Sequence, residues 1–113
     1  MSTRRLIVFR NRVRTGNETA YGDAANAVYA LVEKMPGFVA SKDFVAEDGE
    51  RLALIEFDAA EHLAAWRDHP DHVRAQADGR SRWYTEYSLQ VCEIVRTSRF
   101  DAATGTWERD RVR

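Results

Sequence analysis

The sequence predicts a single α+β domain in which helices cover one face of a four-stranded antiparallel sheet. The length of 113 residues suits one domain with one core. Runs of β-branched and aromatic residues alternate with stretches of helical periodicity, and hydrophobic residues, 44% of the total, are spread along the chain. A formal net charge of -1 gives no indication of nucleic acid binding.

The first two elements follow from local patterns. Residues 5–13, RLIVFRNRV, are β-branched and aromatic and end before Thr15-Gly16, which predicts a strand. Apolar side chains then recur at steps of three and four residues until Pro36-Gly37, which predicts a helix. These side chains are Tyr21, Ala25, Val28, Leu31, Val32 and Met35.

Two further strands are expected on either side of the sequence EDGE. Residues 38–46 and 51–57 are apolar runs of strand length. The pair Asp48-Gly49 between them is expected to supply the positive φ angles of a tight turn, so the two strands form an antiparallel hairpin.

The second helical region contains an internal break. Asp58, with Glu61 three residues later, predicts a capping box that opens a helix. Pro70 must end that helix, and it suits the first position of a new helix running to about Gly79. Residues 83–95 predict a last strand. The resulting order, βαββαβ, is the ferredoxin-like arrangement.

The strands predict a sheet that is apolar on both faces. Leu6 and Val8 point to one face and Ile7 and Phe9 to the other, and Leu89 and Val91 likewise oppose Cys92 and Ile94. Two helices can cover only one face of such a sheet. We therefore expect a homodimer in which the second faces pack together.

A short extension follows the predicted domain of residues 1–96. In residues 97–113, Phe100 and Trp107 lie on either side of DAATGT, which predicts a hairpin. The segment has too few apolar residues to fold alone, so we expect it to contact the partner subunit.

The single cysteine and the short N-terminal apolar run indicate the cellular compartment. Cys92 is the only cysteine, which excludes an intrachain disulfide and suits a reducing cytoplasm. The continuous apolar run Leu6 to Phe9 is too short for a signal peptide or a membrane span. We expect a cytoplasmic protein without membrane partners.

The three histidines do not predict a metal site. His62 and His69 would share one side of a continuous helix, but Pro70 bends the chain next to the second of them, and His72 follows the bend. The glycines are scattered through turns, so neither a flavin nor a nicotinamide cofactor is indicated.

Three segments carry a resemblance to a known family. FRNRVRTG (9–16), MPGFVASKDF (35–44) and residues 56–94, which contain a tryptophan followed by a histidine-rich break, resemble the antibiotic biosynthesis monooxygenase family of dimeric α/β-barrels. The resemblance covers residues 6–96. It implies a homodimer with a cavity between sheet and helices in each subunit. Members include cofactor-independent oxygenases of aromatic polyketides, quinol oxygenases and haem-degrading enzymes, and many have no established activity.

The first functional hypothesis is a cofactor-independent monooxygenase of a small aromatic, polyketide or quinone-type metabolite. Such an enzyme needs a base, a donor for the developing oxyanion and a dry aromatic pocket. The catalytic candidates are His72 as base, Asn11 as amide donor and Trp66. The substrate-binding candidates are Phe9, His69, Trp83, Tyr84 and Tyr87. Trp66 also suits a core position, and His69 also suits a helix cap.

Two alternatives remain open. Haem-degrading relatives use an asparagine, a tryptophan and an iron-ligating histidine; Trp66 matches, but Gln76 occupies the histidine position, with His72 one turn earlier. Aligning on Gly16 places Phe9 where the asparagine belongs, two residues from Asn11. The second alternative is a non-catalytic accessory dimer that binds a small molecule. The sequence favours an enzyme without a cofactor, with haem as the alternative cofactor.

Overall fold

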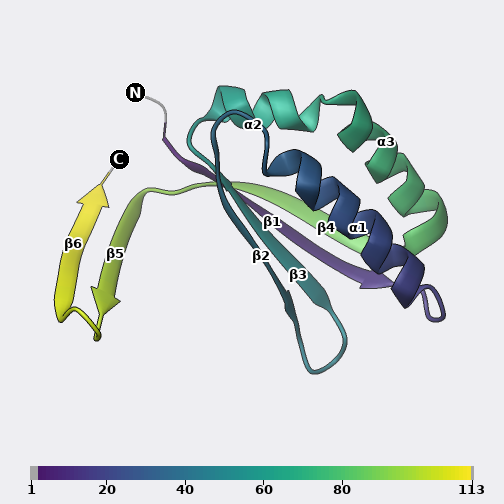
Figure 1. Ribbon diagram of the computed structural model, residues 1–113, viewed down its shortest axis with the longest axis horizontal. Coiled ribbons are helices and arrows are strands. Elements are labelled where there is room, and N and C mark those ends of the chain that lie inside the picture. Colours follow the sequence, from purple (N-terminus) through teal and green to yellow (C-terminus); the bar gives the residue numbers. More distant parts are fainter. Residues whose placement is uncertain (1–2, 113) are drawn as a thin grey trace.

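The computed structural model describes residues 3–112, the side chains of 109–112 excepted, and confirms the βαββαβ order (Figure 1). The elements are β1 (Arg5–Val13), α1 (Glu18–Val32), β2 (Phe38–Val45), β3 (Arg51–Phe57), α2 (Ala60–Arg67), α3 (Pro70–Asp78), a π-helical turn (Gly79–Trp83), β4 (Tyr84–Glu93), β5 (Arg96–Asp101) and β6 (Thr106–Val112). The break at Pro70 is confirmed, with the proline in the first turn of α3.

The sheet is antiparallel with strand order β2-β3-β1-β4. Ile7 in the central strand β1 lies opposite Ile55 in β3 and Val91 in β4, and this register fixes which residues share a face. Figure 1 shows the helices on one side of the sheet. The predicted fold class is therefore confirmed.

The core lies between the sheet and the helices. Its buried cluster consists of Ile7, Val32, Ile55, Phe57, Leu63 and Trp66, drawn from β1, α1, β3 and α2. Phe9 packs against this cluster, and its neighbours Val8 and Arg10 point to the opposite face. The prediction that Ile7 and Phe9 share the face opposite Val8 is confirmed, and this face is the one that the helices cover.

The turn between β2 and β3 differs from the prediction. Only Gly49 has a positive φ, of 90°, and no residue other than glycine adopts one among the described residues. The Ala46 amide donates to the Glu50 carbonyl at 2.8 Å, and the Gly49 amide donates to Ala46 at 2.9 Å. The loop is thus longer than a two-residue turn, and such a loop needs left-handed backbone only at its last position.

The predicted capping box is wrong. Helix α2 has Ala59 at its N-cap without a side-chain cap, and Asp58 Oδ1 lies 2.6 Å from His62 Nδ1 instead. Asp58 and His62 are four residues apart, about one helical turn, so the carboxylate contacts the imidazole instead of capping the helix. The pair covers Gly37, whose φ is 82° and where an added Cβ would lie 2.3 Å from His62 Nδ1. The Pro36-Gly37 turn therefore requires glycine for both conformation and space.

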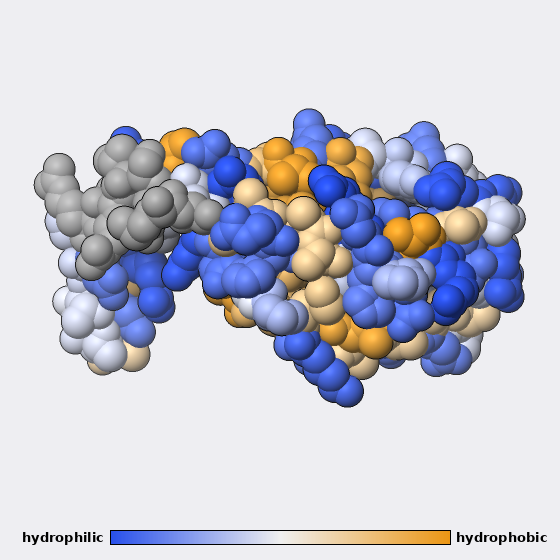
Figure 2. All heavy atoms as spheres, turned by 90° about the horizontal axis from the view of Figure 1, so that it is seen from above, coloured by the Kyte–Doolittle hydropathy of each residue, from blue (hydrophilic) through white to orange (hydrophobic). Residues whose placement is uncertain are grey.

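The C-terminal strands β5 and β6 form a separate two-stranded hairpin. Figures 1 and 2 both show this hairpin at one end of the molecule, apart from the helices. Phe100 and Trp107 lie opposite each other across it and are 70% and 64% exposed. Two large aromatic side chains thus remain in contact with solvent in the single chain.

None of the helices within residues 3–112 is long and apolar enough to cross a membrane.

Candidate active site

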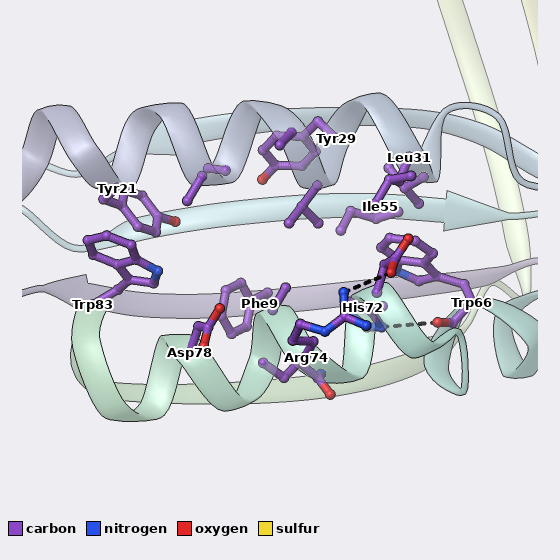
Figure 3. Close-up of a pocket in the computed structure, with 18 of the residues that line it drawn as sticks. Phe9, Tyr21, Tyr29, Leu31, Ile55, Trp66, His72, Arg74, Asp78 and Trp83 are labelled. Carbon is purple, nitrogen blue, oxygen red and sulfur yellow. Dashed lines mark hydrogen bonds and ion pairs between the residues drawn. The ribbon is translucent and has the colours of Figure 1, made fainter.

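A cavity of about 480 Å³ lies between the sheet and helices α1 and α3 (Figure 3). This volume is within the range of small-molecule sites. Its wall is mostly apolar or aromatic with a few polar groups. The lining residues include Phe9, Tyr21, Tyr29, Trp66, Asp71, His72, Arg74, Ala75, Gln76, Asp78, Trp83, Tyr84 and Leu89.

The structure brings five of the eight site candidates from the sequence to this wall. They are Phe9, Trp66, His72, Trp83 and Tyr84. The other three, Asn11, His69 and Tyr87, are not among the lining residues. His69 caps α3, with its Nδ1 accepting from the Asp71 amide at 3.1 Å. The Tyr87 hydroxyl accepts from Arg80 at 3.1 Å, and its ring packs on Phe9.

His72 is held by the bend between α2 and α3. Its Nδ1 lies 3.0 Å from the Trp66 carbonyl oxygen near the end of α2, and its ring stacks on the Trp66 indole with centroids 4.2 Å apart. A carbonyl oxygen can only accept, so Nδ1 carries the hydrogen and the neutral ring has its lone pair on Nε2. Burial lowers the pKa of His72, against the opposing effect of its backbone hydrogen bonds. The imidazole thus lies on the cavity wall, and burial favours its neutral form.

Trp66 belongs to both the core and the cavity. Its side chain is 1% exposed and packs in the central cluster, while one part of it lines the cavity beside His72. The two interpretations of this residue are therefore compatible. The indole stacks on the His72 ring and so fixes its position.

Asn11 is an anomaly in the interior. It is 3% exposed, and its Oδ1 has no hydrogen-bond partner in the described part of the chain. In the sheet it lies between Arg51 and Tyr87, two residues beyond Phe9 on the helix-facing side. An unpaired buried polar group costs about 1–3 kcal/mol, so this amide has hydrogen-bonding capacity that the fold itself does not use.

Several wall residues escaped the sequence analysis. Tyr21 was assigned only to the core face of a helix, although its hydroxyl accepts from Tyr84 Oη at 3.2 Å. Asp71, Ala75 and Asp78 share one side of α3 at spacings of four and three residues, and all three line the cavity. This spacing was the signal that could have identified the two carboxylates.

Comparison with known proteins agrees with the geometry. Residues 5–78 match the family described as antibiotic biosynthesis monooxygenase. The uncharacterized protein YqjZ of Bacillus subtilis is 30% identical over 97 residues, which are 86% of this chain and 85% of that protein. The chain therefore belongs to the antibiotic biosynthesis monooxygenase family.

Solved structures share the fold. SnoaB from Streptomyces nogalater, described as a cofactor-independent oxygenase, matches with a TM-score of 0.74 and 14% identity, over 85% of this chain and 97% of SnoaB. A conserved protein from Bacteroides thetaiotaomicron matches with a TM-score of 0.67 and 24% identity, over 82% of this chain and 98% of that chain.

Proposed function

We propose that this protein is a cofactor-independent monooxygenase of a small aromatic, polyketide or quinone-type metabolite. The observation that carries the proposal is the imidazole of His72, hydrogen-bonded through Nδ1 and stacked on Trp66, on the wall of a largely apolar cavity. Family membership and the likeness to SnoaB support the same reaction class. Oxygen uptake with an anthrone, in the absence of any added cofactor, tests this proposal.

The proposed reaction begins with proton transfer. His72 Nε2 removes a proton from a phenol or anthrone, and the resulting electron-rich anion donates an electron to dioxygen. For an anthrone, a CH₂ group becomes a carbonyl. This oxidation releases four electrons, which reduce one molecule of dioxygen. One of its oxygen atoms becomes the carbonyl oxygen of the product, and the other leaves as water. The balance is complete without an external reductant. Trp66 and Phe9 would hold the ring system against the sheet.

Asn11 is proposed as the donor to the developing oxyanion. Asn11 does not itself line the cavity, and its support is the unpaired Oδ1 of a nearly fully buried amide on the same sheet face as Phe9. The Oδ1 and Nδ2 atoms of an amide can exchange places by a flip, so either can be presented to a ligand.

Replacing Asn11 by leucine tests this role. The leucine removes the unpaired buried amide, so the free energy of unfolding should rise by about 1 kcal/mol. Turnover should fall about 10²-fold if the amide is the main oxyanion donor. Urea unfolding and steady-state kinetics measure the two effects. A variant that is more stable and equally active would show that Asn11 has no catalytic role.

A haem-binding or haem-degrading protein is the second candidate. The observation in its favour is the lone pair of His72 Nε2, since imidazole is an axial ligand of haem iron. The remaining wall does not fit a porphyrin with two propionates, because Asp71 and Asp78 are acidic and Arg74 is ion-paired with Asp71. We therefore expect a free-haem spectrum after incubation with haem. An intense, shifted Soret band would instead favour a haem-binding protein over the cofactor-independent oxygenase.

A non-catalytic accessory dimer is the third candidate. It would use the same cavity to bind a small aromatic molecule, so it differs from the first candidate only by turnover. Binding without oxygen uptake across a panel of anthrones and hydroquinones would favour it.

We propose that the protein acts as a homodimer through the outer face of the sheet. This face carries half-buried or exposed apolar side chains from three strands: Leu6, Val8, Phe44, Leu52 and Leu54. Charged groups beside them are paired within the chain, Arg4 with Glu56 and Arg10 with Glu50. Lys42, opposite Leu54, lies over the Phe44 ring without an ion pair to another described side chain. An apolar face on which most charges are compensated suits contact with a second copy of itself about a two-fold axis.

Light scattering should give a mass of about 26 kDa, twice the 13.0 kDa of the chain. The physical reason is the apolar outer face, which is costly to leave in water. A 13.0 kDa species at micromolar concentration would contradict the proposed interface.

The hairpin is proposed to clasp the partner subunit through Phe100 and Trp107, the two exposed aromatic residues. Removing residues 97–113 should raise the dimer dissociation constant, and the double substitution Phe100→Ser, Trp107→Ser should do the same. Sedimentation measures the constant, and circular dichroism should show the remaining fold intact. An unchanged constant in both variants would show that the hairpin has another purpose.

We propose the cytoplasm as the cellular site. Cys92 on β4 is a free, partly buried thiol, which is suited to a reducing compartment.

A further inference from the structure

We propose that the end of the cavity opposite His72 is a polar subsite, formed by Tyr21, Asp78 and Trp83, that selects a neutral oxygen substituent and rejects a carboxylate. Figure 3 shows these three side chains together at one end of the cavity and Trp66 with His72 at the other. The inference rests on the proposed function in one respect only, that the cavity binds the substrate.

The subsite is built by an irregular segment. After Asp78 the chain forms the π-helical turn Gly79–Trp83, and Trp83 emerges from it almost fully buried. Turns of this type are rare and are frequent at functional sites. Gly79 is required for space, because an added Cβ would lie 2.5 Å from the Tyr84 ring. The turn therefore places Trp83 and Tyr84 as the end wall.

Two hydrogen-bond donors of this wall are available to a ligand. The Tyr84 hydroxyl donates to Tyr21 Oη, so the hydrogen of the Tyr21 hydroxyl is not used in that contact. The indole Nε1 of Trp83 forms no hydrogen bond within the described residues and in Figure 3 points toward the cavity. Both groups can donate to a carbonyl or hydroxyl oxygen.

Cations hold these two rings from behind. The Arg51 guanidinium lies 5.4 Å from the Tyr21 ring centroid, and the Arg82 guanidinium lies 4.6 Å from that of Trp83. Such contacts attract the guanidinium groups to the ring faces and stabilise the positions of the rings. Neither cation is among the residues that line the cavity, so neither is placed to form a direct ion pair with a ligand there.

Asp78 supplies the hydrogen-bond acceptor of the subsite, and its charge discriminates between neutral and anionic ligands. Its carboxylate rises from the last turn of α3 toward the cavity and makes no hydrogen bond or ion pair to another described side chain. An ionised carboxylate accepts a hydrogen bond from a hydroxyl but repels another carboxylate, and this repulsion is strong where water is partly excluded. The subsite thus suits a phenol or hydroxyketone and opposes an aromatic acid.

The ligand class follows from the two ends together. His72 requires a group that can lose a proton, and the far subsite requires a neutral oxygen that both accepts and donates hydrogen bonds. We infer a flat aromatic substrate with an acidic hydroxyl or methylene at one end and an uncharged hydroxyl or hydroxyketone at the other.

Calorimetric titration with two probes tests this inference without turnover. The probes are 2,6-dihydroxynaphthalene and 6-hydroxy-2-naphthoic acid, which differ only in the second substituent and in its charge at neutral pH. The wild-type protein should bind the diol at least about tenfold more tightly than the acid. Asp78→Asn should bring this ratio close to about one by removing the repulsion and weakening the contact to the diol.

Asp23→Asn is the matched control, since Asp23 is exposed on α1 and does not line the cavity. It should leave the ratio as in the wild type. Tyr21→Phe should weaken binding of the diol while retaining the ring. An Asp78→Asn ratio equal to that of the wild type, or no binding of either probe, would overturn the inference. Failure to consume oxygen would count against the proposed reaction and leave the binding ratio as a separate result.

Discussion

Replacing His72 by alanine should lower the turnover number about 10²–10⁴-fold, the usual contribution of a general base. KM should change less, because the cavity wall loses only one of several contacts. His62→Gln is the matched control, since His62 pairs with Asp58 outside the cavity and should keep wild-type kinetics. Full activity of the His72 variant on the true substrate would remove the base assignment, and the substrate's own acidity would then have to drive proton loss.

The pH dependence should follow from the burial of the same ring. The folded pKa of His72 lies below its usual 6.5, so the neutral base persists to lower pH than an exposed histidine allows. The acid limb of kcat should therefore fall below pH 6.5 in the wild type and be absent in the alanine variant. The free energy of unfolding should also fall as the pH falls below 6.5, because the unfolded chain binds a proton at His72 more readily than the folded chain does.

Replacing Trp66 by alanine should lower the free energy of unfolding by about 3–5 kcal/mol, the cost of removing a fully buried aromatic side chain. The indole is 1% exposed and packs between the central cluster and the His72 ring. Guanidinium unfolding measures the loss. Trp66→Phe should cost much less and should instead change ligand affinity or product pattern, because it reshapes the cavity. A loss below about 1 kcal/mol for the alanine variant would show that the core does not depend on this residue.

The fold was predictable because its signals are local. The alternation in β1, the helical spacing in α1 and the position of Pro70 each depend on neighbouring residues, and the structure reproduces them. The turn at Gly49 and the N-terminus of α2 were not predicted correctly. In both places a shift of one or two residues changes which side chain satisfies the backbone.

The candidate site was less predictable because it depends on tertiary geometry. The contact of His72 with the Trp66 carbonyl exists only because the chain bends between two helices. A π-helical turn, which no periodic pattern indicates, connects Asp78 to Trp83, and Tyr21 lines the same cavity from α1. The sequence therefore named five residues that line the cavity, and it missed Tyr21 and Asp78.

Oxygen uptake with 1,8-dihydroxyanthrone tests the central claim most directly. The assay uses protein treated with chelator and assayed without flavin, nicotinamide or haem. We predict that one dioxygen is consumed for each anthrone converted to the anthraquinone and that one atom of labelled oxygen enters the product. The rate should fall about 10²–10⁴-fold in His72→Ala. No uptake above the uncatalysed rate with this or related anthrones, or uptake that requires added haem, would contradict the account.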